Sequence, residues 1–133
     1  MFGFVKSNTK PEVPVIKTLP TTASTEYKIG DALILSAGGL VKATGTTKPE
    51  YIAAADYNAP AEKNEDLPVY LISPGMEWET TFAADASAVT VGTKVTIHTD
   101  GAQVTATATG GVAQILKKHG TGAVGTKATV MFV

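Results

Sequence analysis

The sequence predicts a mainly β protein, arranged as a small two-lobed antiparallel β-barrel or sandwich with an extended N-terminal arm. Three observations lead to this fold class. From residue 27 onward, short runs of β-branched and apolar residues alternate with glycine-containing turns. No segment carries apolar residues at the 3.6-residue period of a helix. The same order of strands and glycines occurs twice, about 60 residues apart.

Residues 1–26 form the predicted arm. Pro11, Pro14 and Pro20 exclude a regular helix there, because proline fixes φ and biases the residue before it toward extended backbone. The arm is too apolar for a purely solvated tail, so we expect it to lie on its own domain or on a neighbouring molecule. We also expect the rest of the chain to stay folded when residues 1–20 are removed. The side chains predicted to contact a partner or a neighbouring subunit are Phe2, Phe4, Val5, Val13, Val15, Ile16 and Leu19.

Residues 27–133 are predicted to form a single β domain with two pseudo-repeats, at about 27–73 and 89–133. The first begins with a hairpin that turns at Gly38 and Gly39, a glycine pair typical of tight β-turns. The polar stretch from residue 58 to 66 is expected to be a loop. The strands expected in this half are 32–35, 40–44, 51–55 and 68–72.

The second pseudo-repeat follows the same plan, with its hairpin turn at Asp100 and Gly101. The strands expected in it are 92–98, 103–107, 112–116 and 127–133. Between the halves, residues 76–82 read as a strand in which Met76, Trp78 and Phe82 share one face. A single tryptophan in a β domain is most often a core residue. These three side chains are nevertheless the candidate subunit interface, because tryptophan is enriched among interface hot spots.

Composition argues against several functional classes. The 133 residues include no cysteine, which excludes disulfides and thiolate chemistry, and the net charge is −1. All 11 basic residues are lysines, whereas nucleic-acid binders usually lean on arginine in a basic patch. No apolar run approaches the ~20 residues needed to cross a bilayer, and the first residues do not resemble a secretory signal. We therefore expect neither nucleic acid nor membrane as a partner, and synthesis in a cytoplasm.

The motifs that carry catalytic chemistry are weak or absent. Residues 120–125 match the spacing G-x-G-x-x-G, but no helix can follow within the remaining residues, so we interpret them as a loop. His98 and His119 are too few for a metal site, which usually needs three or four ligands. Glu77 and Glu79 share a face of one strand and fit the polar side of an amphipathic strand better than an acid/base pair. We predict no enzyme activity, no catalytic residue, no cofactor and no metal.

Four segments, taken in order, resemble the capsid decoration (cement) proteins of tailed bacteriophages. They are residues 27–33 (YKIGDAL), 39–43 (GLVKA), 49–53 (PEYIA) and 122–132 (GAVGTKATVMF). The resemblance covers residues 27–133 and leaves the arm unmatched. It implies a small β domain that binds the outside of a phage head, with the major capsid protein as partner and a homo-oligomer, commonly a trimer, as the assembled form. It implies location on the outer capsid surface of the virion, synthesis in the host cytoplasm and no catalysis.

The residues themselves agree with such a structural role, and two alternatives stay open. An apolar arm can add a strand to a neighbour's sheet edge and staple adjacent capsomers without covalent bonds. One alternative is a virion-surface module that binds a carbohydrate or receptor, for which aromatics gathered on one face are expected. The other is a small hydrolase that uses Glu77 or Glu79.

Overall fold

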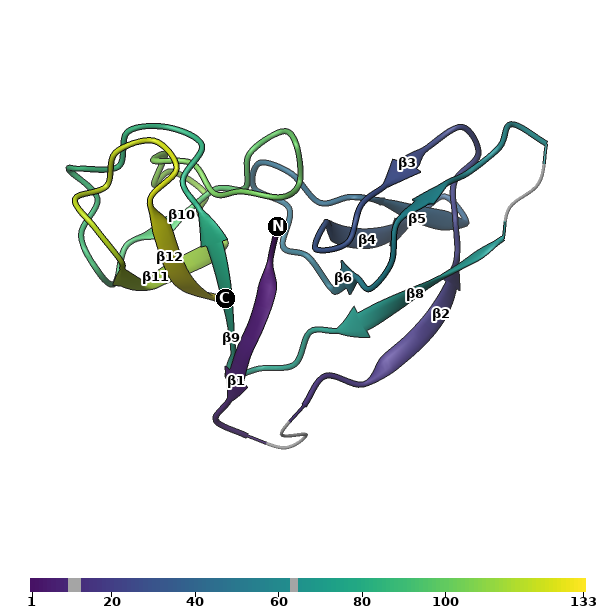
Figure 1. The fold of residues 1–133 in the computed structure, drawn as a ribbon, viewed down its shortest axis with the longest axis horizontal. Helices are drawn as coiled ribbons and strands as arrows, with labels where there is room; N and C mark the ends of the chain where they lie inside the picture. Colours follow the sequence, from purple (N-terminus) through teal and green to yellow (C-terminus); the bar gives the residue numbers. More distant parts are fainter. Residues whose placement is uncertain (10–12, 63–64) are drawn as a thin grey trace.

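The computed structural model describes residues 1–9, 13–62 and 65–133, which form twelve β-strands and no helix. Two five-stranded antiparallel sheets lie side by side (Figure 1). The N-lobe sheet has the order β2 (Ile16–Pro20), β8 (Asp66–Leu71), β6 (Tyr51–Ala53), β4 (Ala32–Ser36) and β5 (Gly39–Lys42). The C-lobe sheet has the order β1 (Gly3–Ser7), β9 (Met76–Thr81), β12 (Lys127–Phe132), β11 (Ala113–Lys118) and β10 (Lys94–Val95). A small third sheet pairs β3 (Glu26–Tyr27) with β7 (Tyr57–Asn58).

The mainly β fold predicted from the sequence is confirmed, and of the two predicted arrangements the sandwich fits. Each large sheet has two ends and does not close into a barrel. One core cluster joins the lobes, because Ile52 of β6 packs in the same buried group as Trp78 of β9 and Val130 of β12. A second cluster, which includes Tyr27 and Leu67, lies within the N-lobe.

The two sheets repeat one topology in the same register. In the N-lobe, Leu19 of β2 pairs with Leu67 of β8. In the C-lobe, Thr80 of β9 pairs with Ala128 of β12, and both partners lie 61 positions further along the chain. The predicted repeat began at residue 27, whereas the structure places β2 and β9 in corresponding positions. The repeated units therefore run from β2 to β8 and from β9 to β12.

The second predicted hairpin, over residues 92–107, is shorter than expected. β10 pairs with β11, and the two predicted hairpin strands share an isolated bridge between Ile97 and Val104. Backbone hydrogen bonds also join them, from the His98 amide to the Gln103 carbonyl at 2.8 Å and from the Thr105 amide to the Thr96 carbonyl at 3.0 Å. Ile97 also exchanges two backbone hydrogen bonds with Gly45 of the N-lobe, at N···O distances of 2.8 and 3.0 Å. The hairpin is thus bonded both within its own lobe and to the N-lobe.

The arm is part of the folded domain. β1 pairs with β9 in the C-lobe, β2 pairs with β8 in the N-lobe, and the arm therefore contributes a strand to each sheet (Figure 1). Phe2, just before β1, is only 2% exposed. The structure argues against the expectation that residues 1–20 can be removed without unfolding the domain, because their removal takes away two strands and a buried aromatic side chain.

Candidate interaction surface

The exposed part of the arm is an apolar segment on the N-lobe side. Val13, Val15 and Ile16 have exposed fractions of 66%, 45% and 62%, and Val5 on β1 is 46% exposed. Large apolar side chains scattered singly are normal on a protein surface, whereas three of these lie within residues 13–16 of the chain. We call Val13, Val15 and Ile16 the arm patch.

The other three predicted contact residues of the arm point into the protein. The Phe2 ring packs against Phe132, with ring centroids 5.2 Å apart. Phe4 is partly buried and meets Trp78 edge to face, at 5.5 Å and 73°. Leu19 is partly buried against the N-lobe cluster. In the single chain, these side chains stabilise the arm on its own domain, so the contact surface is smaller than the sequence suggested.

The candidate subunit interface on β9 also needs correction. Met76, Trp78 and Phe82 are 1%, 0% and 0% exposed. The pattern correctly places Met76 and Trp78 on one face of β9, with Phe82 directly after the strand, but all three side chains lie in the protein's own core and none is offered to a partner. Periodicity shows that a face is apolar, and it does not show what covers it.

An apolar cavity of about 290 Å³ lies beside the arm, between the two lobes. The indole Nε1 of Trp78, one of its lining residues, is buried and has no hydrogen-bond partner among the described residues. No local sequence signal marks this cavity, because its walls come from segments far apart in the chain. Its lining residues are Met1, Phe2, Gly3, Phe4, Pro14, Ile29, Gly30, Ala53, Tyr70 and Trp78.

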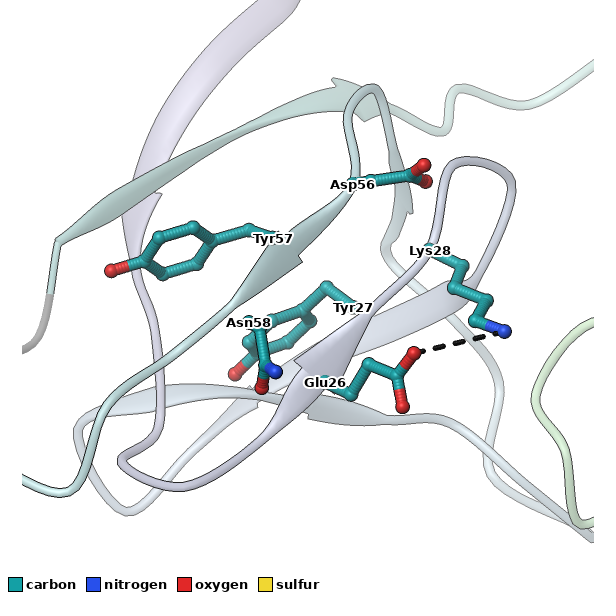
Figure 2. A pocket seen from close by; sticks show the side chains of 6 residues that line it. All are labelled: Glu26, Tyr27, Lys28, Asp56, Tyr57 and Asn58. Carbon is teal, nitrogen blue, oxygen red and sulfur yellow. Dashed lines mark ion pairs between the residues drawn. The ribbon is translucent and has the colours of Figure 1, made fainter.

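A second, polar pocket lies along the β3–β7 pair and is lined by Glu26, Tyr27, Lys28, Asp56, Tyr57 and Asn58 (Figure 2). Its polar groups are largely engaged in the fold. The Tyr27 hydroxyl donates to the carbonyl of Leu40 at 2.6 Å, and Asp56 accepts from the Ile29 amide at 2.7 Å. The side chains of Asp56 and Tyr57 point in opposite directions (Figure 2). These side chains do not converge on one ligand position.

The two β9 carboxylates each have a lysine partner on a different neighbouring strand. Glu77 is buried, lies 3.7 Å from Lys6 of β1 and accepts a hydrogen bond from the Asn8 side-chain amide at 3.1 Å. Glu79 lies 3.7 Å from Lys127 of β12. Each ion pair joins β9 to one of its neighbours, β1 or β12. Glu77 and Glu79, which the sequence offered as a possible acid/base pair, therefore have a structural role here.

The remaining polar candidates are dispersed. His98 Nδ1 lies 3.3 Å from Asp100, whereas His119 Nε2 lies 2.9 Å from the Thr129 hydroxyl. Within residues 1–9, 13–62 and 65–133 there is no group of three or more His, Cys, Asp or Glu that fits a metal ion. The stretch 120–125 is a loop between β11 and β12, as expected. No helix of the described chain is long and apolar enough to cross a membrane.

Asp31 is the most deeply buried carboxylate near the lobe boundary, with a side chain that is 5% exposed. It accepts a hydrogen bond from the Lys28 amide at 2.9 Å and lies 3.8 Å from the Lys42 ammonium. Burial raises the pKa of this carboxyl, and the Lys28 hydrogen bond and the Lys42 charge oppose that shift only in part.

Comparison of the chain with protein-family models and with curated protein sequences finds no match.

Proposed function

We propose that this protein is a capsid decoration protein of a tailed bacteriophage, which binds the outer surface of the head and joins neighbouring capsomers without covalent bonds. The observation that carries the proposal is the arm patch, an exposed apolar segment beside an apolar cavity. The order of the strand and glycine segments, which resembles that of decoration proteins, supports the same function.

In the proposed mechanism, each copy buries a few apolar side chains against the capsid, and assembly into an oligomer combines these weak contacts. Burying one valine or isoleucine side chain contributes about 1.5–3 kcal/mol, so the arm patch alone gives a modest affinity for the major capsid protein. A homo-oligomer, which we take to be a trimer, presents three such patches at once. Effective concentration then raises the overall avidity well above that of one contact. Binding between proteins through apolar contacts needs neither arginine nor a catalytic group.

A binding experiment with heads tests the function directly. Purified full-length protein is mixed with expanded, undecorated heads of the phage that encodes it and sedimented. We expect the wild-type chain to co-sediment at saturable stoichiometry, and cryo-electron microscopy of the particles to place it outside the shell as trimers. Failure of the wild-type chain to bind such heads contradicts the proposed function.

Paired substitutions test the assigned surface. The double variant Val13→Asp, Ile16→Asp places charge on the arm patch, and we expect it to bind heads at least about tenfold more weakly, since two apolar contacts are lost. The matched control is Val91→Asp, Val124→Asp, because these valines are 60% and 67% exposed and lie outside the arm. If both double variants bind heads equally well, the arm patch is not the binding surface, but the proposed function is not contradicted.

A further inference from the structure

The outer edge of β2 is open, whereas the corresponding edge of β9 is occupied. β2 and β9 hold the same place in the repeated topology, and β1 pairs antiparallel with the side of β9 that faces away from β12. In the described chain, a single parallel bridge from Thr21 to Leu40 of β5 lies just past the end of β2, and no strand pairs with the matching side of residues 16–18, which borders the molecule (Figure 1). The strand therefore keeps a row of backbone donors and acceptors without a strand partner.

The backbone groups on this edge can be assigned from the ladder. The Leu71 amide donates to the carbonyl of Val15 at 2.8 Å, and the Thr21 amide donates to the carbonyl of Glu65 at 3.2 Å. Bonding direction alternates along an antiparallel strand. The odd-numbered residues of β2 therefore bond to β8, and the N–H and C=O groups of Ile16 and Thr18 point outward.

The pairing of β1 with β9 also indicates which β2 side chains an added strand would face. In the C-lobe, Phe4 stands opposite Trp78 and Lys6 opposite Glu77. Because the two units differ by 61 positions here, the β2 residues in those places are Lys17 and Ile16. Lys17 is exposed and has no ion-pair partner among the described residues, and Ile16 is 62% exposed.

We propose that the outer edge of β2 accepts an antiparallel strand from a different protein chain, with an acidic side chain opposite Lys17 and an apolar side chain opposite Ile16. Charge complementarity selects a different chain. The end strands of the two large sheets, β1, β2, β5 and β10, contain only neutral or basic residues, so those strands of a second copy offer no carboxylate to Lys17. Pro14 and Pro20 limit the open edge to a short segment, and lysine on an edge disfavours pairing with itself. This proposal goes beyond the proposed function and does not depend on it.

Synthetic peptides provide the probe. The acidic probe is a nine-residue peptide whose five central residues are those of β1 with glutamate in place of Phe4 and isoleucine in place of Lys6, which gives Gly-Glu-Val-Ile-Ser. The basic peptide has lysine in place of that glutamate. Each is titrated into the isotopically labelled full chain and followed by amide NMR shifts and hydrogen exchange. We expect the acidic peptide to shift and protect β2 amides and to bind about two- to tenfold more tightly than the basic one, as cross-strand charge pairs allow. In Lys17→Glu, the preference reverses.

Two substitutions at one position test the backbone. Thr18→Pro removes an outward N–H without removing a bond to β8, and we expect it to abolish peptide binding. Thr18→Val keeps the N–H and is expected to bind as wild type. Three results would each overturn the proposal. They are NMR shifts confined to residues outside β2, peptide binding by Thr18→Pro equal to that of the wild type, and an unchanged preference for the acidic peptide in Lys17→Glu. Self-association of the free chain through β2, seen by sedimentation velocity and lost in Thr18→Pro, also overturns it, since the partner is then a second copy.

Discussion

Replacing Phe2 by alanine tests whether the arm is part of the folding unit. The Phe2 ring is 2% exposed and packs against Phe132, while its amide donates to the carbonyl of Gly30 at 2.9 Å. The backbone bond survives the substitution, so the change reports the side chain. A buried Phe→Ala substitution costs about 3–5 kcal/mol, a large part of the roughly 5–15 kcal/mol by which a domain is stable. We expect the melting temperature to fall by about 10–20 °C.

Trp78 provides the readout, because it is the only tryptophan and is fully buried. Its fluorescence is followed during guanidinium denaturation of Phe2→Ala and of the control Val5→Ala. The control lies on the same arm but is 46% exposed, so it should lose less than about 1 kcal/mol. We expect Phe2→Ala to lower the denaturation midpoint with an unchanged m-value. If its loss does not exceed that of the control, the arm does not contribute to the core and our description of the fold is wrong.

Three further substitutions test other parts of the structure. Lys118→Met removes an ammonium that donates to the carbonyls of Ala86 and Val89, both at 2.9 Å, and should lower the free energy of unfolding by about 1–3 kcal/mol in urea titrations. Because the pKa of Asp31 is raised, the folded state binds its proton more tightly than the unfolded state does. The stability of the wild type should therefore decline relative to Asp31→Asn as the pH rises from the ordinary pKa of 3.8 through the pKa of the folded state. Thermal melts of the two proteins, run in parallel across that pH range, check the sign. Gly122→Ala should destabilise more than Gly38→Ala in thermal melts. Both glycines have positive φ, but an added Cβ meets backbone at 2.6 Å only at Gly122.

Local signals in the sequence predicted the strands that depend on neighbours in the chain. The glycine pair correctly predicted the hairpin of β4 and β5, but the turn consists of Ala37 and Gly38 rather than Gly38 and Gly39, because Gly39 already pairs with Ser36. β12 follows from its alternating apolar residues, because the pleat is set within a few residues. The β3–β7 pair was not predicted, since each strand has only two residues and its partner is far along the chain. For the same reason, the sequence does not predict which strands β1 and β2 of the arm pair with.

The candidate surface was predicted only in part. Apolar character identified the whole arm, but it does not distinguish a side chain that fills its own core from one that awaits a partner. Phe2 and Ile16 look equivalent in the sequence, yet one is 2% exposed and the other 62%. The difference arises from which sheet edge each part of the arm meets: β1 lies between the lobes, whereas β2 lies on the border of the molecule (Figure 1).

The unequal use of two equivalent edges has a consequence for assembly. A chain with two open strand edges can pair indefinitely with copies of itself, which is the route to aggregation that natural sheets avoid. Here β1 closes the edge of β9, and Pro14, Pro20 and Lys17 restrict the edge of β2. These restrictions leave room for one short strand at the edge of β2. Under our proposal, each copy takes up one partner strand at the β2 edge, and this edge by itself does not extend into a fibre.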